Sequence, residues 1–519
     1  MAVEIDTWTE LAAMSSGLDG DYILTGNLGT GDGDYPSTWT PIGGYSGTPF
    51  TGTFDGQDYT IDGLTINTSN DYQGLFGYTS GATIYNLNLT NISLQVGGYS
   101  GGLVGRTAGV SKVSGVTVTG SIDADDYCGG IIGYSSTSVT ILNCDVDLTY
   151  FEVDSGNNAG GIIGYTTGSG YVSGCVANVD NLYTAYYSSG DIGGLVGYSS
   201  GLVIEDCHTS GAITGVAYSD DNIGGLVGYL SNSVMKKCYS SMSVTNQGDH
   251  IGGAVGNTYG SVIEDCYSTG NVTHTYTSIG YRVGGFVGYI AQTQIINCYS
   301  TGDASGYVGN VGGFVGEVSS GIIMNCYAWG SAVNTGTNAG GFVGTNAGTI
   351  KDCYSTGSAS AVTLSGGFDA VNTGTITNCF WDTTTSGNAT STSGTGRTTT
   401  QMQTLSNFSS IWAIVDIDSA NLVRPPFWSM DDGSTYPILN VGNILGAIEG
   451  NVTLSGSPLS GAKITAIDSS NNFVENYATS DGSGDYSIPV RAGTYNVVCE
   501  YESGGVYYTD ESKPNVVVS

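Results

Sequence analysis

Carboxylates are the side chains of this sequence that could most readily do chemistry. The chain has 519 residues and carries 45 Asp and Glu but only 11 Lys and Arg. Two carboxylates that face each other across a cleft can hydrolyse a glycosidic bond. Asp123, Asp125 and Asp126 cluster in the segment IDADDY, where they could also hold a Ca²⁺ ion. A turn that these charges keep solvated is the simpler interpretation of the same residues.

Basic partners for such chemistry are scarce. A polysaccharide lyase would place a basic residue beside its Ca²⁺ site. Between Arg106 and Arg397 the chain offers only Lys112, Lys236, Lys237, Arg282 and Lys351. None of them pairs convincingly with a carboxylate cluster in the sequence. We therefore expect no catalytic residue, no enzymatic activity and no cofactor, with Ca²⁺ as the one ion left open.

The 11 cysteines indicate a packed interior rather than a metal site. No CxxC or Cys/His spacing typical of zinc ligands is present. A free Cys behaves as a small buried hydrophobe, and we expect Cys128 and Cys499 to be buried thiols. The other nine recur at one place in a repeat, which predicts an inward-facing ladder. The ladder residues are Cys144, Cys175, Cys207, Cys238, Cys266, Cys298, Cys326, Cys353 and Cys379.

The three histidines give no catalytic pattern. His208 directly follows Cys207, at the place where Tyr239, Tyr267 and other tyrosines follow their own cysteines. It is therefore predicted to be one rung of a side-chain column. His250 and His274 stand in variable linkers, where the sequence shows no partner for them.

Aromatic residues favour binding over catalysis. The chain contains 36 tyrosines, and Tyr183, Tyr186 and Tyr187 lie together in the linker LYTAYYSSGD. Exposed aromatic rings among Asn, Asp and Ser suit a glycan or protein surface. We predict these three tyrosines as binding residues. The alternative is that their rings pack against the side of the fold.

The elements that must position these residues form an internal repeat. A Gly-Gly-apolar-apolar-Gly motif, such as GGLVG from Gly193 or GGFVG from Gly284, recurs at a period of about 30 residues. Short apolar runs split by Gly, Asn and Ser indicate strands and turns. No proline occurs between Pro49 and Pro425, as expected where every strand donates hydrogen bonds to neighbours. We predict an all-β fold, a right-handed parallel β-helix with one coil per repeat.

The two ends of the chain lack the repeat pattern and predict other elements. Residues 1–65 are predicted to be an N-terminal cap with the first strands, including a short helix over 6–15 in which Thr7 and Glu10 form a capping box. The β-helix occupies 66–379. Residues 380–441, rich in aromatics, should cap the last coil. Residues 444–519 show short strands at spacings near ten residues, which predicts a small Ig-like β-sandwich.

Composition excludes several classes of protein. With 11 basic residues and a net charge of −34, the chain cannot neutralise a phosphate track, so we expect no nucleic-acid partner. No run of about 18 apolar residues exists, so we expect no membrane insertion. The acidic charge should keep a long rod soluble and stop rods from pairing side by side.

The motifs GGLVG and CYSTG, the segment FTGTFDGQDYTIDGLTI and the tail beginning CFWDTTTSGN together resemble GLUG-repeat proteins over about residues 20–440. That resemblance implies a parallel β-helix of adhesin-like surface proteins and supplies no catalytic residue. The segment from Gly450 to Ala462, with Gly493-Thr494-Tyr495, is similar to the carboxypeptidase regulatory-like sandwich, a spacer and binding module.

These features predict a non-enzymatic structural and recognition protein. The start at Met1, without a basic and then apolar leader, fits a chain whose leader was removed, a cytosolic protein or a viral structural protein. We favour a virion protein such as a tail fibre, spike or capsid surface protein. Its partners would be other virion or surface proteins and a glycan or protein receptor on the host, and a homo-oligomer is plausible. The alternative is an extracellular adhesin or filament subunit of a prokaryotic cell surface. A polysaccharide-degrading β-helix enzyme is the third hypothesis.

Overall fold

The computed structural model divides the chain into two compact units, Met1–Met402 and Gln403–Ser519, which are described separately. The structure describes residues 2–44, 47–154, 158–184, 190–215, 222–276, 281–307, 309–412, 414–416, 428–439, 446–454, 457–459, 462–468, 474–480, 483–490, 493–503, 506–510 and 516–518. The division falls inside the predicted cap over 380–441, so the two parts of that segment belong to different units.

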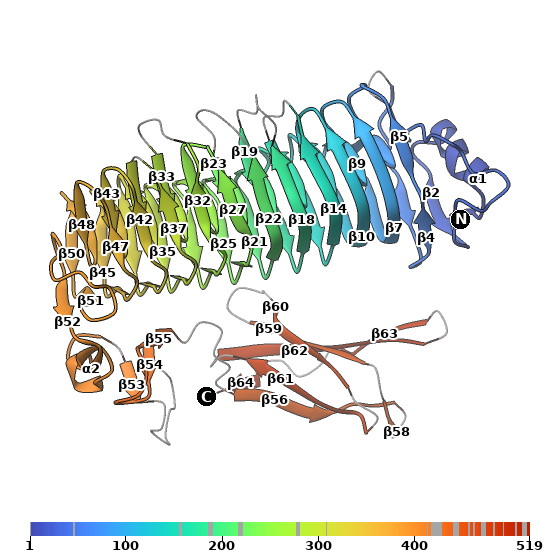
Figure 1. Ribbon diagram of the computed structural model, residues 1–519. Helices are drawn as coiled ribbons and strands as arrows, with labels where there is room; N and C mark the ends of the chain where they lie inside the picture. Colours follow the sequence, from blue (N-terminus) through green and yellow to red (C-terminus); the bar gives the residue numbers. More distant parts are fainter. Residues whose placement is uncertain are drawn as a thin grey trace. The chain divides into compact units, whose positions relative to one another are not determined.

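The first unit is a parallel β-solenoid (Figure 1). Its strands form three sheets, named A, B and C here, and sheets B and C have 11 and 10 strands within the described residues. Within each sheet a strand pairs with the strand one repeat away, as where Val196 lies opposite Val227. The predicted all-β fold with one coil per repeat is confirmed.

Sheets B and C contain the glycine-rich motifs. Sheet B consists of β6 (Phe76–Ser80), β9 (Val104–Ala108), β12 (Ile132–Ser135), β16 (Ile163–Thr166), β20 (Val196–Ser200), β24 (Val227–Ser231), β29 (Val255–Tyr259), β34 (Val287–Ala291), β39 (Val315–Val318), β44 (Val343–Asn346) and β49 (Asp369–Asn372). Sheet C consists of β8 (Ser100–Gly101), β11 (Cys128–Gly129), β15 (Asn158–Gly160), β19 (Asp191–Gly193), β23 (Asn222–Gly224), β28 (His250–Gly252), β33 (Tyr281–Gly284), β38 (Gly309–Gly312), β43 (Asn338–Gly340) and β48 (Leu364–Gly366).

Sheet A is the largest and contains three columns of strands. The column before the cysteines consists of β1 (Val3–Ile5), β2 (Asp21–Leu24), β3 (Thr53–Asp55), β7 (Thr83–Val96), β10 (Ser111–Ala124), β13 (Val139–Leu142), β17 (Gly170–Ser173), β21 (Leu202–Glu205), β25 (Val234–Lys236), β30 (Val262–Glu264), β35 (Thr293–Ile296), β40 (Gly321–Met324), β45 (Thr349–Lys351) and β50 (Thr375–Thr377). The column after them consists of β14 (Asp145–Val153), β18 (Val176–Thr184), β22 (His208–Gly215), β26 (Tyr239–Ser240), β31 (Tyr267–Ser268), β36 (Tyr299–Ser300), β41 (Tyr327–Ala328), β46 (Tyr354–Ser355), β51 (Phe380–Asp382) and β52 (Thr395–Arg397). This second column also includes β4 (Thr60–Asp62), which pairs with the middle of β7. The third consists of β5 (Thr65–Asn67), β27 (Ser243–Asn246), β32 (Val272–His274), β37 (Ala304–Gly306), β42 (Ala332–Asn334) and β47 (Ala359–Ser360).

The interior of the solenoid is filled by ladders of apolar side chains. Phe286, Phe314, Phe342 and Phe368 are fully buried and stack on one another, with ring centroids 4.8–4.9 Å apart. All nine ladder cysteines are buried and free, one in each of nine coils. The spacing of these stacks equals the separation of paired strands, because identical positions repeat at every coil.

A helix closes the N-terminal end of the solenoid. Helix α1 spans Trp8–Ala13 and is followed by the 3₁₀ turn η1 (Met14–Ser16). The hydroxyl of Thr7 accepts a hydrogen bond from the Glu10 amide at 3.2 Å, and the Glu10 carboxylate accepts one from the Asp6 amide. Trp8, Leu11 and Met14 are buried in the core, so the predicted capping helix is confirmed. In the described residues no helix is long and apolar enough to cross a membrane.

The other end of the solenoid is covered by residues that follow Cys379. Strand β51 continues sheet A and pairs with β52, and helix α2 (Thr399–Met402) ends the unit. The Trp381 ring packs in the core, and its indole nitrogen donates to the Asn388 carbonyl at 3.0 Å.

The second unit contains a small aromatic cluster and an antiparallel β domain. Trp412 stacks on Phe408 and Trp428 within this unit. Here lie η2 (Leu405–Asn407), β53 (Ile414–Asp416), β54 (Trp428–Met430) and β55 (Ile438–Leu439). The antiparallel domain consists of β56 (Gly446–Asn451), β57 (Thr453–Leu454), β58 (Ser457–Pro458), β59 (Lys463–Asp468), β60 (Val474–Thr479), β61 (Asp485–Val490), β62 (Gly493–Ser503), β63 (Val506–Asp510) and β64 (Val516–Val518). Cys499 on β62 is partly exposed, so the prediction that it is buried is wrong.

Candidate binding surface

The glycine-rich motif forms the corner between sheets C and B. In the copy from Gly193, strand β19 ends at the first glycine and β20 begins at Val196. Leu195 and Val196 are buried, and a Cβ on Gly194 would overlap the carbonyl oxygen of Gly225 in the next coil. This close approach explains why the second glycine of the motif recurs. The residue after the motif, Tyr198, is half-buried on the outside of sheet B.

Tyrosines repeat at this outward position. Opposite one another on successive strands of sheet B lie Tyr78, Arg106, Tyr134, Tyr165, Tyr198 and Tyr229. The last four rings stack with centroids 4.7–5.4 Å apart and interplanar angles of 5–18°. Each ring therefore holds its neighbours in place, which fixes a row of phenol groups on the solenoid surface.

A second tyrosine file begins just before sheet C. The rings of Tyr72, Tyr99 and Tyr127 stack at 5.2 and 4.8 Å. All three have positive φ angles, 59°, 56° and 45°, which bulky residues rarely adopt. Tyr127 also packs edge-on against Tyr134 and Tyr165, which joins the two files. These eight tyrosines (Tyr72, Tyr78, Tyr99, Tyr127, Tyr134, Tyr165, Tyr198 and Tyr229) are called the tyrosine face below.

Further along the solenoid, polar side chains replace some of the tyrosines. Asn222 donates from Nδ2 to the Asp191 carboxylate at 2.6 Å, and its Oδ1 lies 2.8 Å from His250 Nδ1. Burial raises the pKa of Asp191 to about 7, so this carboxyl is partly protonated near neutral pH. Burial, together with the charge of Arg282, lowers the pKa of His250 to about 3, which keeps its ring neutral. The expectation that His250 lies in a linker without a partner is wrong.

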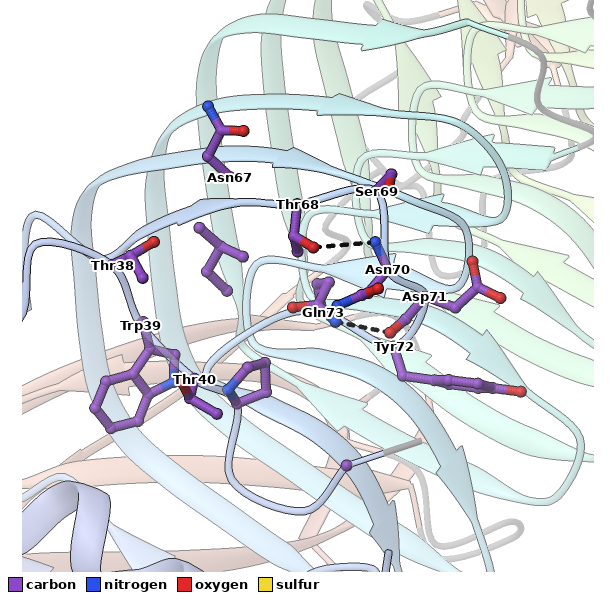
Figure 2. Close-up of a pocket in the computed structure, with 13 residues that line it drawn as sticks. Thr38, Trp39, Thr40, Asn67, Thr68, Ser69, Asn70, Asp71, Tyr72 and Gln73 are labelled. Carbon is purple, nitrogen blue, oxygen red and sulfur yellow. Dashed lines mark hydrogen bonds between the residues drawn. The ribbon is translucent and has the colours of Figure 1, made fainter. Parts of the chain in front are cut away.

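A groove adjoins the start of the tyrosine face. It has a volume of about 700 Å³ and lies between residues 38–44 and the turn at 66–73 (Figure 2). Asn70, Ser69 and Asp71 are exposed along it, and Tyr72 lies at its edge. The backbone of the turn is held locally, since Gln73 Nε2 donates to the Asp71 carbonyl at 2.7 Å. Amide and hydroxyl groups beside an aromatic ring can recognise the hydroxyls of a sugar.

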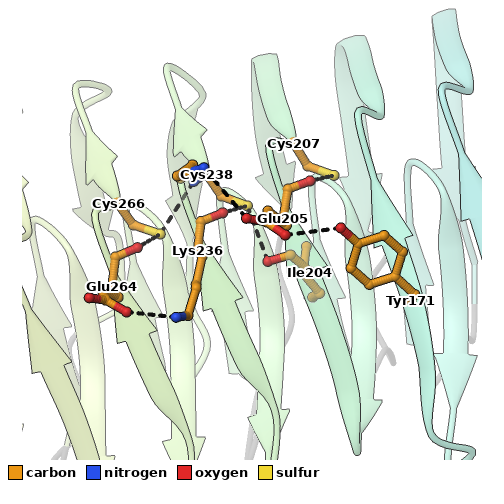
Figure 3. A network of polar contacts seen from close by, with 9 residues as sticks. Tyr171, Ile204, Glu205, Cys207, Lys236, Cys238, Glu264 and Cys266 are labelled. Carbon is orange, nitrogen blue, oxygen red and sulfur yellow. Dashed lines mark hydrogen bonds and ion pairs between the residues drawn. The ribbon is translucent and has the colours of Figure 1, made fainter. Parts of the chain in front are cut away.

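Sheet A carries charged side chains that pair with one another, unlike the tyrosine face and the groove (Figure 3). The Tyr171 hydroxyl donates to Glu205 at 2.9 Å, and Lys237 lies 3.6 Å from the same carboxylate. Lys236 and Glu264 form an ion pair at 2.9 Å. Inside the wall, the Cys238 thiol donates to a backbone carbonyl at 3.1 Å. These contacts join side chains of neighbouring coils. The groups bond to one another, so we do not count them among the candidate binding residues.

Another aromatic file lies on sheet A. His208 stacks on Tyr239 with centroids 4.8 Å apart and an interplanar angle of 3°, which confirms it as a rung of the column. The file continues through Tyr267, Tyr299, Tyr327 and Tyr354 at 4.7–5.3 Å. Its last two members are buried, unlike the tyrosines of sheet B.

The tyrosines predicted from the longest linker occupy a different region. Tyr183 is half-buried on β18, and Tyr186 and Tyr187 lie outside the described residues. Their role in binding therefore stays a prediction. The tyrosine face was missed, although its signal is visible: six copies of the glycine-rich motif are followed directly by Tyr, as in GGLVGY from Gly193.

The predicted calcium residues lie at the end of one strand. Asp123 ends β10 with Ala124, and Asp125 and Asp126 follow in the turn. Burial and the nearby charges of Asp154 and Asp125 raise the pKa of Asp123. Within the described residues, no group of three or more His, Cys, Asp or Glu side chains could hold a metal ion. The Ca²⁺ site stays a prediction.

Two protein-family models match parts of the chain. The GLUG motif matches residues 248–273, 279–305 and 335–360, and the carboxypeptidase regulatory-like domain matches residues 447–516. These matches and the parallel solenoid identify a GLUG-repeat β-helix followed by an Ig-like domain. No curated protein matches the chain.

Solved structures resemble the chain only weakly. One is a Bacteroides ovatus protein provisionally described as an immunoglobulin A1 protease, with 17% identity over 84% of this chain and 92% of that one, at a TM-score of 0.24. Another is an IgA1 protease, with 13% identity over 98% of this chain and 34% of that one, also at a TM-score of 0.24. Likeness at this level carries no argument about activity.

Proposed function

We propose that this GLUG-repeat β-solenoid is a non-enzymatic recognition rod that binds a glycan or protein receptor on a host surface. The observation that carries the proposal is the tyrosine face: stacked, half-buried phenol groups repeated along one side of a stiff scaffold. Tyrosines supply large contact area at low entropic cost and add a polar hydroxyl.

The stacked coils also support a role in binding a ligand rather than in catalysis. Every coil pairs with the next, so a side chain repeated at one position forms a row with fixed spacing. Such a row offers several equivalent contacts to a ligand that is itself a repeating polymer, and linked contacts raise the overall affinity. The setting we propose is the surface of a virion, with a prokaryotic cell surface as the alternative.

Binding of the full chain to host-surface glycans and to host cells tests this function. We expect the full chain to bind, and Tyr198→Ala to weaken binding about tenfold, as for an interface aromatic. Tyr267→Ala is the matched control, because it removes the same side chain from a stacked file on sheet A. Equal losses in both variants would refute the tyrosine face as the binding surface.

Incubation of the full chain with the same host-surface glycans tests whether the protein is non-enzymatic, as we propose. Oligosaccharides released from the glycan by the wild-type chain would overturn it. Antibodies against the chain should label purified virions; labelling of prokaryotic cells alone would move the proposed setting to a cell surface.

A further inference from the structure

Arg106 interrupts the tyrosine face. It stands on β9 directly between Tyr78 on β6 and Tyr134 on β12. Its guanidinium carbon lies 5.5 Å from the Tyr78 ring centroid and 5.7 Å from those of Tyr72 and Tyr134. Nη1 donates to the Tyr72 hydroxyl at 3.3 Å. Three aromatic rings thus hold the cation in one place.

No carboxylate pairs with this arginine among the described residues, where ion pairs involve Lys236, Lys237, Arg282 and Lys351 instead. An arginine has five N–H donors, and the bond to the Tyr72 hydroxyl uses one of them. Its Nε is buried without an acceptor. The chain has a net charge of −34, so carboxylates are abundant. Arg106 is nevertheless a half-buried cation at the surface, with N–H donors left to bind a ligand.

We infer that Arg106 binds the carboxylate of an acidic sugar, a uronic or sialic acid residue of the surface glycan that the proposed function requires. The planar guanidinium fork matches a carboxylate and can hold it with two hydrogen bonds. The rings of Tyr72, Tyr78 and Tyr134 lie around the guanidinium, and a tyrosine hydroxyl can exchange hydrogen bonds with the hydroxyls of the same sugar.

The surroundings restrict what can bind. Asp71 and Asp126 directly precede Tyr72 and Tyr127 in the chain, and these carboxylates disfavour an anionic ligand except where the arginine supplies a positive charge. Tyr72 belongs both to this cage and to the groove (Figure 2). A glycan with its acid group on Arg106 can therefore extend its neutral residues toward the amide and hydroxyl groups at Asn70 and Ser69.

The test compares acidic sugars with neutral counterparts. Trigalacturonate and its methyl ester share a backbone, and sialyllactose and lactose differ by the acidic residue. Binding of the full chain is measured by calorimetry at fixed salt. We expect at least one acid to bind about tenfold or more tightly than its neutral counterpart. Arg106→Gln should abolish this preference, and Arg106→Lys should retain part of it because charge remains without the fork.

Lys112→Gln is the matched control, since it removes the same charge from an exposed residue on sheet A and should change nothing. Unchanged circular dichroism and melting of Arg106→Gln show that the fold is intact. Equal binding of acid and neutral sugars, or a preference that survives Arg106→Gln, overturns the inference. If the chain still binds host surfaces while both acids fail to bind, the inference falls and the recognition function stands.

Discussion

The second glycine of the repeat motif should tolerate no side chain without a loss of stability. At Gly285 a Cβ would overlap the carbonyl oxygen of Gly313 in the next coil and would lie 3.2 Å from that of Gly302. Both neighbours are backbone atoms, so no side chain can rotate away. The coils would have to separate locally, where Gly285 donates to the Gly312 carbonyl at 3.1 Å.

The expected cost follows from these contacts. Overpacking a tight interior costs about 1–3 kcal/mol, and each backbone hydrogen bond that is lost adds about 1 kcal/mol. With one or two bonds affected, Gly285→Ala should lower the free energy of unfolding by about 2–5 kcal/mol. Because each coil contacts only its neighbours, the damage should remain local to this part of the solenoid.

Urea unfolding followed by circular dichroism measures the effect. Gly33→Ala is the control, since a Cβ there meets no atom within 4 Å, and its stability should stay within about 0.5 kcal/mol of wild type. If Gly285→Ala unfolds at the same urea concentration as Gly33→Ala, the coils are less closely stacked than described and the account of the motif is wrong.

Three further outcomes are expected. Phe314→Ala removes the middle of the buried phenylalanine stack and should cost about 3–5 kcal/mol in urea unfolding; a cost below 1 kcal/mol would show that the stack does not support the core. The ladder thiols are all buried, so Ellman's reagent should label partly exposed Cys499 in the native chain and the ladder thiols only after unfolding; rapid native labelling of several thiols would contradict the ladder. Because the pKa of Asp191 rises from 3.8 to about 7 on folding, the folded chain binds the extra proton and this carboxyl's contribution to stability should fall as pH increases from about 4 to 7. Asp191→Asn should remove that slope in melting temperature, and an unchanged slope would contradict the assignment.

The repeat in the sequence predicted most of the solenoid. The glycine-rich motif, the cysteine column and the absence of proline predicted stacked parallel coils, and the structure has them. The residue before each ladder cysteine carried a signal that was missed. Asn143, Asp265 and Asn297 all have positive φ angles of 51–55°, in a conformation that Asn and Asp tolerate better than most residues. This explains the recurring Asn-Cys and Asp-Cys pairs as the turn between two columns of sheet A.

The position of the tyrosine face could not be predicted from single copies of the repeat. The sequence predicts binding residues in the linker at Tyr183, because three tyrosines lie close together there. The tyrosine face is built from residues about 30 positions apart, such as Tyr165 and Tyr198. Nothing in one copy of the repeat reveals that these rings touch. Their stacking depends on the register of parallel pairing between coils.

The coil can be predicted from the sequence, because strand, turn and glycine positions recur and each coil depends on local signals and on its neighbour. Which side chains share a surface depends on how the coils stack. Stacking places the same repeat position of successive coils side by side. The surroundings of a residue that differs in one copy, such as Arg106 among tyrosines, are therefore set by the two neighbouring coils. The sequence gives the charge of that arginine, but its place among three aromatic rings, without an ion pair in the described residues, results from the stacking of coils.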